Sequence, residues 1–171
     1  DSEVNPIKIL ILFFSMTLIS VILDEAGFFL WLASAVMKRA GHSKIRIFII
    51  LYVTVSILTV FTSNDIIVLT FTPFLCFFCK NAKIDPLPFL FCEFVAANTW
   101  SMALIIGNPT NIYLCSSAGA DFMGYIKVML FPTVVAGAVS LVMLLLVFKK
   151  QLFERANELH TEGAKPVTLA D

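Results

Sequence analysis

Two short polar segments interrupt long apolar runs of this 171-residue chain. The first consists of Thr62, Ser63, Asn64 and Asp65, and the second of Gly107, Asn108, Pro109, Thr110 and Asn111. Side-chain oxygens and freed backbone carbonyls can bind a cation, and the free amides at the start of a helix can bind an anion. These two segments are therefore the candidate binding residues.

Asp65 is the only charged residue between Ile47 and Cys79. A carboxylate inside a membrane segment is costly, and it is by default a candidate for function. It would serve either as a ligand of a coupling cation or as a proton carrier. The alternative is that Asp65 caps the helix that follows it, and the two roles can coexist. For the second segment the alternative is an ordinary turn made by a Gly-Asn-Pro breaker.

Three further polar residues precede the second segment. Asn98 and Ser101 are one helical turn apart, so they can face the same cavity. The alternative for this pair is hydrogen bonding between membrane helices. Glu93 lies near the cytoplasmic end of the same helix, where a position at the membrane interface is favoured over a role in the site.

The composition points to a lipid bilayer as the surroundings of this chain. Hydrophobic residues make up 59% and charged residues 14% of the sequence, with 17 Phe, and the mean hydropathy is +0.92. Soluble domains contain about 45–50% apolar and about 25% charged residues. These values exclude a soluble enzyme, a disordered tail and a nucleic-acid binder.

Enzyme and metal motifs are missing from the sequence. There is no P-loop, no HExxH and no dinucleotide-binding glycine pattern. The four cysteines, Cys76, Cys79, Cys92 and Cys115, lie in apolar stretches and are expected to be packing residues. We therefore expect no enzyme, no metal site apart from a Na⁺ site, and no cofactor other than a coupling Na⁺ or H⁺.

An all-α, polytopic membrane domain is expected over residues 1–148. Its elements are a span at 7–23, an interfacial helix at 27–40, a re-entrant hairpin at 47–79, a broken helix at 87–117 and a span at 125–148. Residues 149–171 are expected to form a cytoplasmic linker or tail. Lys and Arg gather in the loops that this arrangement places on the cytoplasmic side.

The re-entrant interpretation depends on the length of the second arm of the hairpin. The apolar run 66–79 has 14 residues, which extend about 21 Å as a helix. The hydrocarbon core is about 30 Å thick, so this arm falls short of a full crossing. Basic residues flank both ends of the hairpin, which favours a polar tip near the middle of the membrane.

The two segments and their neighbours resemble a known transporter family. From Phe61 to Pro73, an Asn-Asp pair precedes an apolar stretch that ends in Thr-Pro, as in the hairpin of the ArsB/NhaD and citrate-transporter branch of the ion transporter superfamily. Residues 88–112, with Ala-Ala-Asn and Gly-Asn-Pro-x-Asn, are similar to the following helix of that family. The resemblance covers roughly residues 23–148.

The resemblance implies an elevator-type permease with two inverted repeats that share one site. Family site residues carry over onto Ser63, Asn64, Asp65, Gly107, Asn108, Thr110 and Asn111, with a Na⁺ site at Ser63, Asn64 and Gly107. Asp65 stands where the dicarboxylate and sulfate symporters have Thr, which favours the ArsB/NhaD side. One hairpin and one broken helix correspond to one repeat, the N-terminal one, so the missing second repeat and a homodimer are the expected partners.

The predicted function is secondary active transport of a small anion or oxyanion, coupled to H⁺ or Na⁺, in the inner (plasma) membrane. Arsenite or antimonite efflux and the transport of a carboxylate or inorganic anion all fit the resemblance. The alternatives are a Na⁺/H⁺ antiporter of the same superfamily and a membrane scaffold subunit that transports nothing. The substrate, the coupling ion and the direction of transport stay open at this point.

Overall fold

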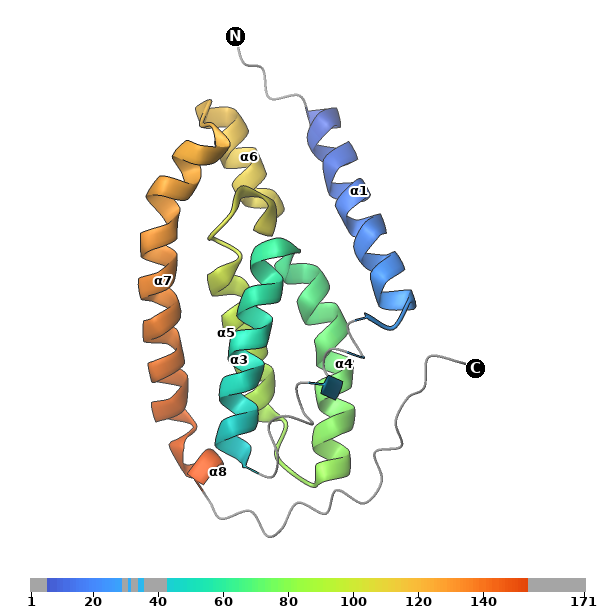
Figure 1. Ribbon diagram of the computed structural model, residues 1–171, viewed down its shortest axis with the longest axis vertical. Coiled ribbons are helices and arrows are strands. Elements are labelled where there is room, and N and C mark those ends of the chain that lie inside the picture. Colours follow the sequence, from blue (N-terminus) through green and yellow to red (C-terminus); the bar gives the residue numbers. More distant parts are fainter. Residues whose placement is uncertain (1–5, 29–30, 32–33, 36–42, 154–171) are drawn as a thin grey trace.

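A computed structural model describes residues 6–28, 31, 34–35 and 43–153 of the chain. Every regular element within these residues is a helix, which confirms the all-α prediction (Figure 1). The helices are α1 (Pro6–Glu25), α3 (Lys44–Phe61), α4 (Asn64–Ala82), α5 (Leu87–Trp100), the short 3₁₀ helix η1 (Ile105–Gly107), α6 (Pro109–Ala118), α7 (Phe122–Val147) and α8 (Lys149–Phe153).

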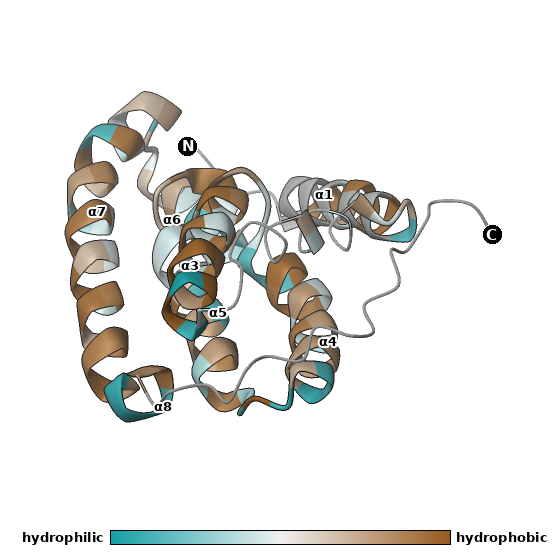
Figure 2. Ribbon diagram, turned by 60° about the horizontal axis from the view of Figure 1, so that its bottom comes forward, coloured by the Kyte–Doolittle hydropathy of each residue, from teal (hydrophilic) through white to brown (hydrophobic). Residues whose placement is uncertain are grey.

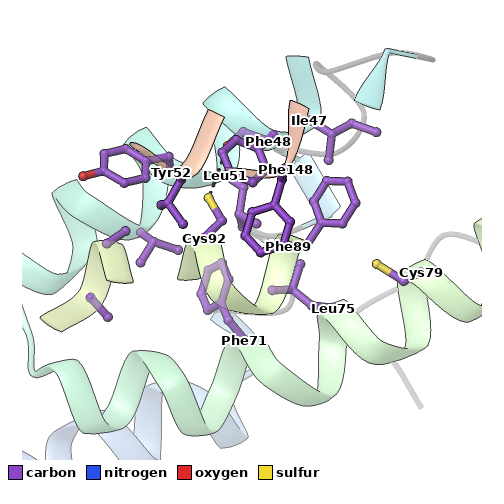
Figure 3. Packing of buried hydrophobic residues seen from close by; sticks show 14 of the residues in the cluster. Ile47, Phe48, Leu51, Tyr52, Phe71, Leu75, Cys79, Phe89, Cys92 and Phe148 are labelled. Carbon is purple, nitrogen blue, oxygen red and sulfur yellow. Dashed lines mark hydrogen bonds between the residues drawn. The ribbon is translucent and has the colours of Figure 1, made fainter. Parts of the chain in front are cut away.

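The helices α3 and α4 form an antiparallel hairpin, and α5 packs against both arms (Figure 1). Buried apolar residues recur at helical spacing on α4, at Ile67, Phe71, Leu75 and Cys79. This spacing places them on one face of the helix, toward the core. Figure 3 shows two of them, Phe71 and Leu75, on the side of α4 that faces Phe89 of α5, and Phe48 of α3 belongs to the same cluster.

Small residues on α5 allow its close contact with the hairpin. Ala96 and Ala97 are fully buried, and Phe48 and Phe89 pack with their ring centroids 6.1 Å apart. Membrane helices associate through such small residues because lipid provides no hydrophobic force between them. The two arms and α5 therefore share one core.

The second arm of the hairpin is longer than the apolar run that predicts it. Helix α4 has 19 residues, or about 28 Å, because it begins two residues before the apolar run, at Asn64, and continues three residues beyond it, to Ala82. It ends at Lys83, whose φ of 53° is left-handed; the Ile84 N–H then donates to the Cys79 carbonyl at 3.0 Å. The length of this arm therefore gives no argument against a full crossing, and the expected re-entrant depth needs other support.

Three described helices, α3, α4 and α7, are long and apolar enough to cross a membrane. Most residues of α7 are apolar, as the hydropathy colouring shows (Figure 2), and many of these apolar side chains are exposed. Its buried positions are few, namely Thr133, Gly137 and Leu144. Lipid is the natural surroundings for such a surface.

Two expected elements fall largely on residues outside the described ranges. Most of the interfacial helix 27–40 and residues 154–171 of the tail are among them. The described start of that tail forms α8, and its Leu152 packs in the core with Phe148.

Candidate binding site at the hairpin tip and the helix break

The tip of the hairpin is a two-residue connection between helices. Thr62 closes α3, with its Oγ1 donating to the Leu58 carbonyl at 2.8 Å. Ser63 has an extended backbone and precedes the first residue of α4, Asn64. Ser63 and Asn64 are both buried, although they connect two helices. The protein thus encloses this part of the tip.

Asn64 joins the tip to α5. Its Nδ2 donates to Oδ1 of Asn98 at 3.1 Å, and Nδ2 of Asn98 donates to the Phe94 carbonyl at 2.8 Å. The structure therefore places Asn98 at the tip, on the helix from which the sequence predicts it to act. The contact is a hydrogen bond between helices, as the alternative interpretation of Asn98 expects, and the binding role of Asn98 stays a prediction.

Two buried oxygens near the tip have no hydrogen-bond partner among the residues that the structure describes. They are Oδ1 of Asn64, whose side chain is 6% exposed, and Oγ1 of Thr59, which is fully buried on α3. Buried polar atoms are nearly always hydrogen-bonded, so each exception calls for an explanation. An oxygen that lacks a donor is suited to a cation.

The break in the second helix begins earlier than the polar segment. Helix α5 ends at Trp100, whereas the apolar run continues to Ile106. Nδ2 of Asn111 donates to the Ser101 carbonyl at 2.9 Å and to the Leu104 carbonyl at 3.3 Å. The Asn111 side chain thus gives the Ser101 carbonyl a donor in place of a helical amide, whereas the Leu104 carbonyl also accepts from the Gly107 N–H at 3.1 Å.

Gly107 allows the chain to fold back at the break. A Cβ at this position would collide with the backbone carbonyl of Ser101. Close approach of two backbones requires a residue without a side chain. Gly107 is buried at the end of η1, which packs against α3.

Helix α6 starts with a complete N-cap. Oδ1 of Asn108 accepts hydrogen bonds from the backbone N–H of Thr110 at 3.0 Å and from its Oγ1 at 2.8 Å. Pro109 occupies the first helical position, where its missing N–H costs nothing. The Thr110 side chain is exposed.

Asp65 is the second residue of α4, and its side chain is exposed. The N-cap position belongs to Ser63, so the structure does not give Asp65 the capping role. Its charge still complements the positive end of the helix.

Glu93 is the residue for which the sequence interpretation is wrong. Its side chain is 1% exposed and lies between α4 and α5, not at an exposed interface. Thr72 Oγ1 donates to its two carboxyl oxygens at 3.2 and 3.4 Å. The sequence does contain a signal for Glu93. Like Asp65, it is a lone carboxylate within an apolar helix.

Hydrogen bonds connect the two polar segments. Asn64 bonds to Asn98, Ser101 Oγ donates to the Asn98 carbonyl at 2.9 Å, and Asn111 donates to the Ser101 carbonyl. The N-termini of α4 and α6 and the C-termini of α3 and α5 belong to these two connections. Paired half-helix ends of this kind are the binding sites of secondary transporters. The fold thus defines a helical membrane protein with interrupted helices at a shared polar centre.

Comparison with known proteins identifies the family. The profile of the CitMHS family, described as citrate transporters, matches residues 6–169. The chain belongs to this family, in agreement with the resemblance in its motifs. No solved structure gives a significant match.

Several curated proteins are similar to this chain. A putative transporter arsB of Dictyostelium discoideum is 31% identical over 84% of the chain and 25% of its own length. A 46 kDa membrane protein of Mycobacterium leprae is 30% identical over 81% of the chain and 32% of its own length. The human P protein is 29% identical over 68% of the chain and 14% of its own length. The chain thus spans about a quarter to a third of the first two relatives.

Proposed function

We propose that this chain is one repeat of a secondary transporter in the plasma membrane, carrying a small anion or oxyanion in exchange for or together with H⁺ or Na⁺. The observation that carries the proposal is the buried Oδ1 of Asn64, which has no hydrogen-bond partner at a tip bonded to the broken helix. Membership in the citrate transporter family and the similarity to a putative arsB transporter support it.

The ion site would lie where the tip meets the break. Asn64 Oδ1 and the Ser63 side chain would contribute oxygens, and the Gly107 segment would contribute backbone carbonyls. The amides at the starts of α4 and α6 would face the anion, since helix N-termini carry partial positive charge. Both helices begin within this polar centre.

A re-entrant hairpin within an elevator-type movement is part of the same proposal. In Figure 1 the tip between α3 and α4 stops part-way along α7, at the level where α5 gives way to α6. Irregular backbone at such a depth is tolerated where protein buries it. A second repeat in inverted orientation would supply the other hairpin and the other half of the site, and a homodimer would complete the assembly.

The test uses the full-length protein that contains this chain, reconstituted in liposomes. Uptake of arsenite and of citrate is measured with an imposed Na⁺ gradient and then with an imposed pH gradient. Asn64→Ala should lower the rate about tenfold or more, because losing a buried polar contact costs about 1–3 kcal/mol. Asn81→Ala is the matched control, since Asn81 is exposed on the same helix.

The possible outcomes separate the candidate functions. Gradient-driven arsenite or citrate flux that depends on Asn64 supports an anion transporter. Na⁺/H⁺ exchange without either substrate would indicate the antiporter instead. A protein that moves neither, with Asn64→Ala indistinguishable from Asn81→Ala, would contradict the proposal and favour a scaffold subunit.

A further inference from the structure

Glu93 is enclosed between helices at a distance from the hairpin tip. Its only described side-chain partner is Thr72 of α4. Thr72 is eight residues beyond Asn64 on α4, or about 12 Å along the helix. The carboxyl group therefore belongs to a second polar level of the same helix pair.

No basic side chain of the described residues pairs with Glu93. The helices α3, α4 and α7 pack against α5, and within the described part of the chain the Thr72 hydroxyl of α4 is the group that hydrogen-bonds to this carboxyl group. On α5 the neighbouring Cys92 thiol donates to the Phe48 carbonyl of α3 at 3.6 Å. The Tyr52 hydroxyl of α3 is engaged by Gly137 and Ser140 of α7.

An ionised carboxylate in these surroundings would cost several kcal/mol, since no cation compensates for the lost water. The neutral acid fits better. The Thr72 hydroxyl can donate to its carbonyl oxygen or accept its proton, because a hydroxyl does both. The enclosed site thus accommodates the protonated group.

We propose that Glu93, positioned by Thr72, is a proton-binding site of the transporter that loads and releases a proton during the transport cycle. This inference rests on the proposed function, and it gives the coupling ion a place separate from Asn64. The proton would come from the aqueous phase on one side and leave to the other, with no covalent change.

The position of Glu93 explains how its ionisation would affect the hairpin tip. Helices α4 and α5 are joined at two levels, by Glu93 with Thr72 and by Asn64 with Asn98. An ionised Glu93 needs water or a cation, so α4 and α5 must separate at that level. Because both helices also carry the tip contact, the same movement alters the Asn64–Asn98 hydrogen bond.

The first measurement is proton binding in the reconstituted full-length protein, followed by infrared spectroscopy. The absorption band of a protonated carboxylic acid should disappear as the pH is raised, and Glu93→Gln should lack this titrating band. Glu25→Gln is the control, because Glu25 is exposed at the end of α1 and should keep it. Thr72→Val should move the midpoint of the titration, and Thr72→Ser should restore it. A band unaffected by pH or by Glu93→Gln would overturn the proposal.

The second measurement is arsenite accumulation under a pH gradient of about one unit, with the membrane potential clamped at zero. One coupled proton should shift the accumulation ratio by about tenfold, and Glu93→Gln should bring it to about one. Arsenite exchange at equal pH should persist in Glu93→Gln. A pH-driven ratio that survives the substitution would also overturn the proposal. If no substrate moves in the unmodified protein, the proposed function fails while the infrared result still decides whether Glu93 binds a proton.

Discussion

The Asn111 side-chain amide donates a hydrogen bond of 2.9 Å to the backbone carbonyl of Ser101. Helix α5 has just ended at this point, and α6 has already begun at Pro109. The bond ties the start of one half-helix to the end of the other, with Gly107 folded against the same Ser101 backbone. A hydrogen bond and a close backbone contact therefore fix the conformation of the break.

Replacement of Gly107 by Ala should disrupt this break. The added Cβ meets a backbone carbonyl that cannot move aside as a flexible side chain would, so overpacking should cost about 1–3 kcal/mol of stability. We expect transport by the reconstituted protein to be lost. Gly119→Ala is the control, because nothing lies within 4 Å of its Cβ. Its φ of +62° costs a comparable amount of stability, about 1–2 kcal/mol. If Gly107→Ala kept as much transport as Gly119→Ala, the close approach at Gly107 would be unimportant.

Asp65→Asn should abolish coupled transport while the protein still inserts in the membrane. Asp65 is adjacent to Asn64 in the first turn of α4, so its charge acts on any cation held at the tip. Gradient-driven uptake and membrane-fraction yield are the measurements. Asp85→Asn is the matched control, since Asn retains the oxygen that accepts from the Leu87 N–H at 3.0 Å. Full coupled activity in Asp65→Asn would remove Asp65 from the site.

Tyr52→Phe should destabilise the contact between the hairpin and α7. The Tyr52 hydroxyl lies 2.7 Å from the Gly137 carbonyl and 2.6 Å from Ser140 Oγ. Loss of such hydrogen bonds costs about 0.5–1.5 kcal/mol each. Thermal unfolding in detergent measures the change, and Tyr113→Phe is the control because Tyr113 is exposed. An identical unfolding temperature for both variants would mean that this contact adds nothing to stability.

The two interruptions could be predicted from local residues. Amides and hydroxyls at 62–65 and a proline at 109 are visible within apolar runs, and helices end where the chain lacks a donor or prefers an extended backbone. Their precise limits could not be predicted. Helix α5 ends at Trp100, and the carbonyl of the next residue, Ser101, accepts instead from the side chain of Asn111, ten residues beyond Ser101.

Apolar runs were also a poor guide to helix length. The sequence predicts that the second arm stops with the apolar residues at Cys79, but α4 continues to Ala82. Polar residues such as Lys80 are good helix formers, so hydropathy marks a change of surroundings and not the end of a helix. Packing of Ile84 against the core accompanies the end of the helix.

Composition and residue type alone determined that this is a helical membrane protein with two polar interruptions, since apolar content and helix breakers act locally. The transporter family followed from the resemblance of its motifs, in agreement with the family match. Tertiary structure alone decided which polar groups meet. Asn64 pairs with Asn98 across 34 positions, and Glu93 accepts a hydrogen bond from Thr72 inside the protein. Such pairings depend on how α4 and α5 pack, and a hydropathy pattern carries no record of which helix face meets which neighbour.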